Sequence, residues 1–291
     1  MDLDGLHRRL YEFNALRLLP CFADEQWEQR LRVEQEHRSS EARFVEAERV
    51  ASRQLASSAP TDADRFVAWF EQLRVSGPGQ GDPLFPWLAE HATLDDMRWF
   101  VFQELSGEAG FDDLVALAQL GLPPRAKLEM ARNYWDEMGR GKERAMHGPM
   151  LERLAEELDV ASLARDEQPV WESLALSNLM VALASNRCYA YQAIGALGVI
   201  ELTAPGRAEL VNAGLTRLGI GGEARRYFAL HATLDVKHSK AWNSEVLAPL
   251  VEQEPRAARA LAEGALMRLA AGARCFARYR KELQPALSCA A

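Results

Sequence analysis

The segment HATLDVKHSK (231–240) concentrates side chains that can bind a metal ion. His231, Asp235 and His238 stand at positions i, i+4 and i+7, which at about 100° per residue places them within roughly 60° of one another on one face of a helix. Each histidine alone is more often a structural or surface residue than a ligand. Two imidazoles and a carboxylate on one face suit iron, manganese or zinc, so the triplet predicts a metal half-site.

A further carboxylate, Glu201, belongs to an apolar segment (185–206) that is predicted to end as a helix just before Thr-Ala-Pro-Gly. An isolated buried charge is costly, so Glu201 either reaches water at this helix end or meets a partner. Antiparallel packing of this helix on the next one would bring Glu201 to the triplet.

Two more segments carry candidate ligands. Glu137 and His147 are ten residues apart, and the Gly139-Arg140-Gly141 break between them prevents a single helical face. Glu104, in WFVFQELSGE, follows four apolar residues and is the best carboxylate of its helix, with a solvated face as the alternative. Glu108, one turn later, is the alternative ligand from the same helix.

These residues form the inventory of a dinuclear iron site in a helical bundle: Glu104, Glu137, His147, Glu201, His231, Asp235 and His238. Four carboxylates balance the charge of two Fe(II), and seven ligands leave open positions for O2 and substrate. The paired Glu-x-x-His motifs of ferritin-like sites are not present, since the only match is Glu34–His37 in a polar segment. HExxH, GxGxxG and P-loop motifs are absent.

The elements that must position these residues are predicted to be helices throughout. Apolar residues recur at three-to-four spacing in segments 93–105, 127–138, 171–197 and 258–283. Thr93 and Asp96 are typical of a helix N-cap, and Pro123-Pro124 is expected to open the next helix. No alternating strand pair occurs, which predicts an all-α fold.

The segmentation predicts two parts, an N-terminal helical arm (1–60) and a helical bundle (61–291). Residues 24–58 are polar but helix-favouring, and the Gly/Pro-rich loop 75–86 follows. Because the arm is too polar to be core, we expect it to pack on a second chain, as a homodimer, or across the bundle.

Composition limits the class of protein. The 291 residues are 48% hydrophobic and 26% charged, with a net charge of −8, which is typical of a globular domain and argues against nucleic-acid binding. No apolar run is long enough for a membrane span and no signal peptide is predicted. Four scattered cysteines, at positions 21, 188, 275 and 289, fit a cytoplasmic protein. The remaining histidines, His7, His37 and His91, are expected to face solvent.

With these motifs, the sequence resembles the haem-oxygenase-like di-iron oxidases and oxygenases, also described as iron-containing redox enzymes. The matching elements are E-x9-H (Glu137, His147), the lone helical Glu201 and H-x3-D-x2-H (His231 to His238), within a similarity that runs from about residue 61 to 283. The resemblance implies a seven-helix bundle that binds two Fe(II), no haem, and uses O2 as co-substrate.

The resemblance also implies an O2-dependent oxidoreductase that acts on a small amine-, amino-acid- or carboxylate-bearing metabolite. The implied outcomes are N-oxygenation or oxidative C–C cleavage, in natural-product biosynthesis. The alternatives are a haem-binding or cofactorless enzyme of the same fold and a metal-free helical interaction protein. Three residues are expected to orient the ligands, Tyr134, Tyr227 and Asn243, and four aromatic residues to line the substrate pocket: Trp99, Phe100, Trp135 and Phe228.

Overall fold

The computed structural model describes residues 2–20, 22, 26–108, 110–165 and 167–283, and every regular element in these ranges is helical. The N-terminal part forms α1 (Leu3–Leu18), α2 (Trp27–Ala56), α3 (Ala63–Ser76), α4 (Leu84–Glu90) and α5 (Leu94–Gly107). The middle forms α6 (Phe111–Ala118), α7 (Pro124–Glu137), the 3-10 turns η1 (Gly139–Gly141) and η2 (Glu143–Ala145), α8 (His147–Glu157), α9 (Val160–Leu163) and α10 (Trp171–Ser185). The C-terminal part forms η3 (Arg187–Tyr189), α11 (Ala190–Arg217), α12 (Arg226–Ala241), the π-helical turn η4 (Trp242–Leu247), α13 (Ala248–Gln253) and α14 (Ala257–Leu283). The predicted all-α class is confirmed.

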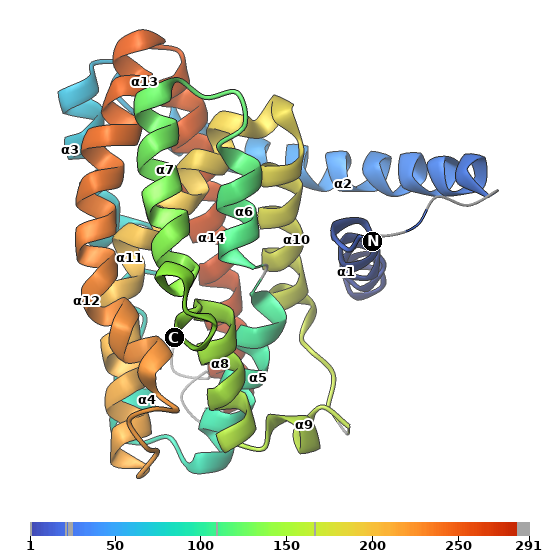
Figure 1. Cartoon of the computed structure of the whole chain (residues 1–291), viewed down its shortest axis with the longest axis vertical. Helices are drawn as coiled ribbons and strands as arrows, with labels where there is room; N and C mark the ends of the chain where they lie inside the picture. The colour runs from blue at the N-terminus through green and yellow to red at the C-terminus, as the bar shows by residue number, and fades with distance from the viewer. Residues whose placement is uncertain (1, 21, 23–25, 109, 166, 284–291) are drawn as a thin grey trace.

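Three long helices, α11, α12 and α14, run side by side along the bundle, and α11 packs on both of the others (Figure 1). The contact between α11 and α14 depends on glycine. A Cβ atom at Gly195 would overlap the carbonyl group of Leu261, and one at Gly264 would overlap the carbonyl group of Gln192. The two backbones therefore touch directly, which fixes α11 in the centre of the core.

The predicted helix starts are confirmed. The side chain of Thr93 accepts a hydrogen bond from the Asp96 amide (3.2 Å), while Asp96 accepts one from the Thr93 amide (2.8 Å), so α5 opens with a capping box. Pro124 occupies the first turn of α7. The Gly-Arg-Gly break is also confirmed, because Gly139, Arg140 and Gly141 all have positive φ and turn the chain into α8.

Two predicted helix boundaries were wrong. The segment 171–197 is not one helix, since α10 ends at Ser185 and α11 begins at Ala190. α11 does not end before Pro205 but continues to Arg217, so Glu201 lies inside a long helix. Proline removes one backbone hydrogen bond, the one that the carbonyl group of Glu201 would accept, and the packing of α11 on two neighbours outweighs this local cost.

α12 continues without interruption into the π-helical turn η4 and then α13. π turns arise where a helix accommodates an extra residue, frequently near functional sites. Here the turn begins four residues after His238. None of the described helices is both long enough and apolar enough to cross a membrane.

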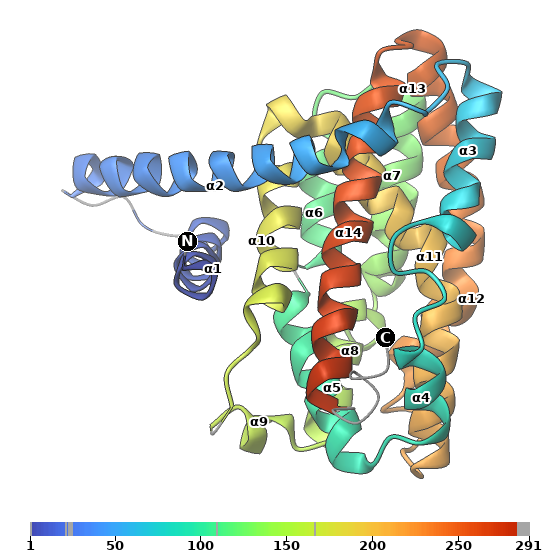
Figure 2. The ribbon, with the colours of Figure 1, turned by 180° about the vertical axis from the view of Figure 1, so that it is seen from behind.

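The arm is only partly separate from the bundle. Its second half crosses α10 and α14, and Val45 and Ala56 belong to the same apolar core as the bundle helices (Figure 2). Its first half extends beyond the bundle, where Trp27 and Leu31 are 60% and 56% exposed.

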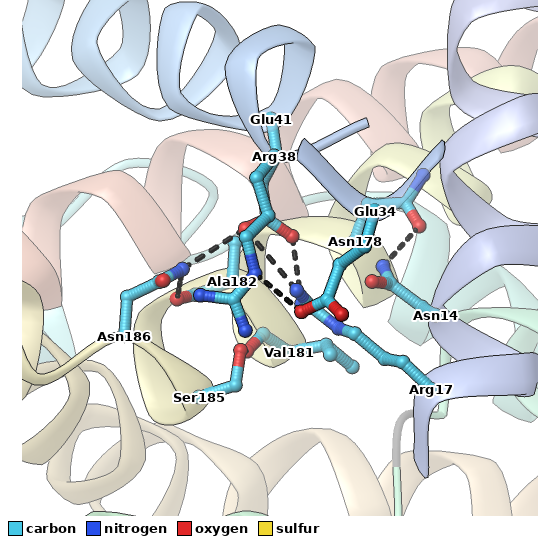
Figure 3. A network of polar contacts seen from close by, with 10 residues as sticks. All are labelled: Asn14, Arg17, Glu34, Arg38, Glu41, Asn178, Val181, Ala182, Ser185 and Asn186. Carbon is cyan, nitrogen blue, oxygen red and sulfur yellow. Dashed lines mark hydrogen bonds and ion pairs between the residues drawn. The ribbon is translucent and has the colours of Figure 1, made fainter. Parts of the chain in front are cut away.

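A polar network joins α1 and the middle of α2 to α10 (Figure 3). Glu41 of α2 pairs with Arg17 (2.7 Å) and accepts a hydrogen bond from the side-chain amide of Asn186 (2.9 Å). Asn14 donates to the side chain of Asn178 in α10 (2.8 Å). Glu41, Asn14 and Asn178 are buried, so these bonds satisfy polar groups that the arm brings against the bundle.

The prediction that His7 faces solvent was wrong, because its side chain is 1% exposed and stacks on Trp171 of α10 (5.6 Å between ring centroids). His37 is half-buried and stacks on Phe13 (4.7 Å), and His91 is exposed as expected. Cys188 and Cys275 are free thiols, exposed and buried respectively. The other two cysteines, at positions 21 and 289, lie outside the described residues.

The close approach of α11 and α14 gives a first prediction. Gly264→Ala should destabilise the protein by about 1–3 kcal/mol, because the added methyl group has no space. Gly206→Ala is the matched control: no atom lies near the added Cβ in this exposed part of α11, so about 0.5–1 kcal/mol of stabilisation is expected. Denaturant unfolding measures both, and equal stability of the two variants would contradict the packing described.

Candidate metal centre

Six of the seven predicted ligands gather in one place from four helices. Glu137 ends α7, His147 begins α8 and Glu201 lies in the middle of α11. The triplet comes from α12, which lies against α11 as expected. Five of the six residues form two overlapping groups of metal-binding atoms, and Asp235 lies beside the second group.

The first group consists of Glu137, His147 and His231, whose ligand atoms all lie within 4.8 Å of one another. Nδ1 of His147 is 2.5 Å from Oε2 of Glu137, yet neither ring nitrogen of His147 makes a hydrogen bond of acceptable geometry. The rings of His147 and His231 are 4.5 Å apart, edge to face. Donor atoms that converge without bonding to one another are what a site for a cation requires.

The second group consists of Glu137, Glu201 and His238, again within 4.8 Å. Nδ1 of His238 is 3.3 Å from Oε2 of Glu201 and 3.9 Å from Oδ1 of Asp235. The three side chains of this group and that of Asp235 are all buried. Because Glu137 belongs to both groups, its carboxylate stands where it can bridge two ions.

The hydrogen bonds of two histidines fix which nitrogen is free. Nδ1 of His231 is 2.7 Å from the carbonyl oxygen of Tyr227, which can only accept, so Nδ1 carries the proton and Nε2 is free. Nε2 of His238 is 3.1 Å from Oδ2 of Asp136, and donation to this carboxylate leaves Nδ1 free. In both cases the bonded partner orients the ring for metal binding.

Two orienting residues were missed by the sequence analysis. The side-chain amide of Asn133 donates to Oε1 of Glu201 (2.5 Å), and Asp136 accepts from both His238 and Arg140. Asn133 is one turn before Glu137 on α7, and this i, i+4 spacing was a usable signal. Asp136 could not be identified in this way, because its hydrogen bond is to His238 on another helix, α12.

Of the expected orienting residues, Tyr227 acts through its backbone carbonyl group and packs its ring on His231 (4.2 Å). The amide of Asn243 donates to Glu71 of α3 (3.3 Å), and Tyr134 packs against the apolar core. Neither makes a hydrogen bond to a candidate ligand among the described residues.

The electrostatics of the cluster are those of a site built for positive charge. Burial, and then the charge of Glu201, holds the pKa of Glu137 well above its ordinary value. Burial with Glu201 and Glu137 does the same for the pKa of Asp235. Burial alone would lower the pKa of His238, but the adjacent carboxylates of Glu201 and Asp136 raise it to about 9. A buried imidazolium is thus the nearest cation when these carboxylates have no other partner.

The other two histidines behave differently. Burial lowers the pKa of both His147 and His231 to about 4, so both rings are neutral at pH 7 and retain a lone pair for a metal. Buried polar atoms without a hydrogen-bond partner include both ring nitrogens of His147, Nδ1 of His238 and Oδ1 of Asp235. Such atoms are rare in native proteins, and these four come from three neighbouring imidazole and carboxylate side chains. The residues therefore fit iron or a similar transition metal.

Comparison with known protein families also indicates iron. Residues 98–273 match the family model of iron-containing redox enzymes. The chain belongs to this iron-containing redox enzyme family. The matched range covers α5 to α14 and includes every predicted ligand.

A solved structure from Shewanella denitrificans OS217, a domain of unknown function with a heme oxygenase-like fold, is similar to this family member at a TM-score of 0.55. The two share 16% sequence identity over 77% of this chain and 93% of the other. The likeness confirms the haem-oxygenase-like fold. No curated protein matches the chain.

The seventh predicted ligand of this iron-containing redox enzyme, Glu104, lies outside both groups. It lines the same cavity, where burial raises its pKa to about 7 against the charges of Arg268 and Arg207. Glu108 accepts a hydrogen bond from the Phe111 amide (3.1 Å) and is among the charges that act on Glu137 and His147. The structure therefore brings Glu108 into electrostatic contact with the cluster and places Glu104 towards the arginines.

One cavity, of about 190 Å³, connects these features. Its lining includes Glu137, Glu201, Asp235 and two of the four aromatic residues expected there, Phe100 and Phe228. Trp99 packs on Tyr279 (5.5 Å) and Trp135 is 54% exposed, and neither lines the cavity. Those two expectations were wrong for this cavity.

The unpaired oxygen of Asp235 gives the second prediction. Asp235→Ala should lower iron content while leaving the metal-free protein as stable as wild type or more stable, because a like charge beside Glu201 and Glu137 is removed. Asp136→Ala is the matched control: it breaks the bonds to His238 and Arg140 and should cost about 1–3 kcal/mol. Thermal melts of metal-free protein and iron analysis measure both effects. A large loss of metal-free stability in Asp235→Ala with unchanged iron content would contradict its assignment as a ligand.

Proposed function

We propose that this chain is a non-haem di-iron oxidase or oxygenase that activates O2 to oxidise a small amine-, amino-acid- or carboxylate-bearing metabolite. N-oxygenation and oxidative C–C cleavage are the proposed outcomes, and natural-product biosynthesis is the proposed setting. Membership of the iron-containing redox enzyme family supports the general class. The observation that carries the di-iron proposal is the pair of buried donor groups that share Glu137.

In this proposal Glu137, His147 and His231 would hold one ion. Glu201, Asp235 and His238 would hold the other, together with the shared Glu137. Two bound Fe(II) ions would supply the electrons that reduce O2, and no haem is involved. Asn133 and Asp136 hold Glu201 and His238 in place through the hydrogen bonds described above.

For the remaining ligand we propose Glu108 in place of Glu104. Two observations support this choice: Glu108 is electrostatically coupled to His147 and Glu137, whereas the charges that act most on Glu104 are those of Arg268 and Arg207. The shared cavity allows substrate to reach the ions, and its apolar part excludes bulk water from the reacting atoms.

Iron stoichiometry tests the proposal. Anaerobic titration should saturate at about two Fe(II) per chain, since two donor groups are present. Glu108→Gln should reduce the stoichiometry to about one, and Glu104→Gln, the matched control from the same helix, should leave it at about two.

Other outcomes would redirect the assignment. Saturation at one iron in wild type, with no second binding phase, contradicts the dinuclear site. A Soret band on addition of haem, with no Fe(II) binding, would indicate a haem-binding relative instead. Loss of the second iron in Glu104→Gln but not in Glu108→Gln would return the ligand role to Glu104.

We also propose that the chain is a homodimer held by the first half of α2, where Trp27 and Leu31 are exposed. Light scattering should give about twice the chain mass of 32.5 kDa for wild type, and Trp27→Glu with Leu31→Glu should give the monomer. Gln29→Glu with Gln35→Glu adds the same charge to exposed positions of this helix and should remain dimeric. A monomeric wild type would contradict the proposal.

A further inference from the structure

The end of the cavity that carries Glu104 also carries two arginines. Arg207 comes from α11 and Arg268 from α14, and both line the cavity together with the candidate ligands Glu137 and Asp235. Arginines are seldom placed inside a bundle without a paired anion, because their charge must be desolvated. Two arginines beside the candidate metal centre are therefore expected to bind an anion.

The surrounding protein holds Arg207 in place but does not neutralise it. Its guanidinium lies 5.5 Å from the ring of Phe276 and 5.8 Å from that of Phe85, and one terminal nitrogen donates to Thr203 (3.2 Å). Burial, and then the charge of Arg268, lowers the pKa of Arg207 to about 10, which still leaves it fully charged at neutral pH.

Arg268 is less well satisfied. Its Nε atom is buried and has no hydrogen-bond partner, and burial lowers the pKa of its guanidinium. Among the described residues, no carboxylate oxygen lies within 4.0 Å of either arginine. The charge of Glu104 acts on both arginines and that of Glu108 on Arg268 alone, but neither carboxylate forms an ion pair with either guanidinium group.

We propose that Arg268 and Arg207 bind the carboxylate group of the substrate and orient the rest of the molecule towards Glu137 and His147. This inference rests on the proposed function and narrows its substrate class. The planar fork of an arginine matches a carboxylate with two parallel hydrogen bonds, and the free Nε of Arg268 supplies one such donor. A neutral amine without a carboxylate would leave both cations unpaired.

The size of the cavity limits the substrate further. At about 190 Å³ it is slightly larger than a cavity of roughly 150 Å³ that holds benzene. By this comparison it has room for a compact carboxylate of about eight non-hydrogen atoms, such as a short amino acid or a short-chain acid, and a long-chain fatty acid does not fit within it.

A second cavity with basic side chains adjoins the first. A second cavity, of about 620 Å³, lies between α3, α4, α11 and α12, and Arg207 and Phe85 line both cavities. Arg74 and Lys240 contribute further positive charge there, beside Glu71 and Asp82. Because Arg207 lines both cavities, its guanidinium group can contact a carboxylate in either one.

Calorimetric binding of hexanoate, hexanamide and dodecanoate tests the proposal, with both metal-free and anaerobic Fe(II)-loaded full-length protein. Hexanoate should bind wild type at least tenfold more tightly than hexanamide, and dodecanoate should not bind.

Arg268→Met and Arg207→Met should each weaken hexanoate binding at least tenfold and leave hexanamide binding unchanged. Arg268→Lys keeps the positive charge but not the planar guanidinium fork, so its affinity for hexanoate should lie between those of wild type and Arg268→Met. Arg259→Met is the matched control on α14, because this side chain is exposed and does not line the cavity, and it should bind like wild type.

The binding measurements on metal-free protein separate this inference from the proposed function. Normal iron stoichiometry in Arg268→Met with lost hexanoate binding supports the arginine site, and a failed iron titration leaves the metal-free result intact. Three results would overturn the inference: no hexanoate binding by wild type, equal binding of acid and amide, or a preference for the acid that appears only with iron and survives both arginine substitutions. The last result would mean that the carboxylate binds the metal.

Discussion

The rest of the structure depends on one electrostatic constraint: three carboxylates, Glu137, Glu201 and Asp235, are buried together in the middle of a helical bundle. Desolvated like charges cannot be stable at such separations without a cation or a proton. Among the described residues, the cation nearest to them is the imidazolium of His238, whose pKa the carboxylates themselves raise. This single charge does not balance three carboxylates. A metal ion would supply the missing positive charge, and neutral His147 and His231 offer it lone pairs beside Glu137.

The bundle meets this constraint by holding the contributing helices rigidly. α11 packs directly against α14 through Gly195 and Gly264, and it contributes both Glu201 and Arg207 to the lining of the cavity. The cavity therefore combines the carboxylates and imidazoles of the cluster with the guanidinium groups of Arg207 and Arg268. A bound molecule with a negative and an uncharged end has only one favourable orientation in such a field, so the fold itself selects which part of the molecule faces the metal ligands.

The sequence predicted which candidate ligands gather better than it predicted their surroundings. His231, Asp235 and His238 were recognised together because spacing along a helix determines which side chains share a face. Glu137, His147 and Glu201 were added from their order and separation in the family that the sequence resembles. Asp136, Arg207 and Arg268 were not readable, because in sequence they resemble any solvated charge, and only contacts between distant helices turn them inwards. His7 was misjudged for the same reason, since the packing of α1 on Trp171 buries a residue near the chain end. Pro205 misled the prediction of α11, where tertiary packing outweighed the local preference of proline to end a helix.

The π-helical turn η4 allows α12 and α13 to be rotated differently about their common helix axis. A residue inserted into a helix turns everything beyond it by about 100°, and here the insertion falls just after His238. The face that carries His231, Asp235 and His238 is thereby set by its contact with α11, whereas α13 is set by its contact with α3. Substitutions that repack the α13 end of the bundle can be absorbed in the turn without rotating the ligands. The sequence of the outer helices can therefore vary while the candidate ligands on α12 keep their positions.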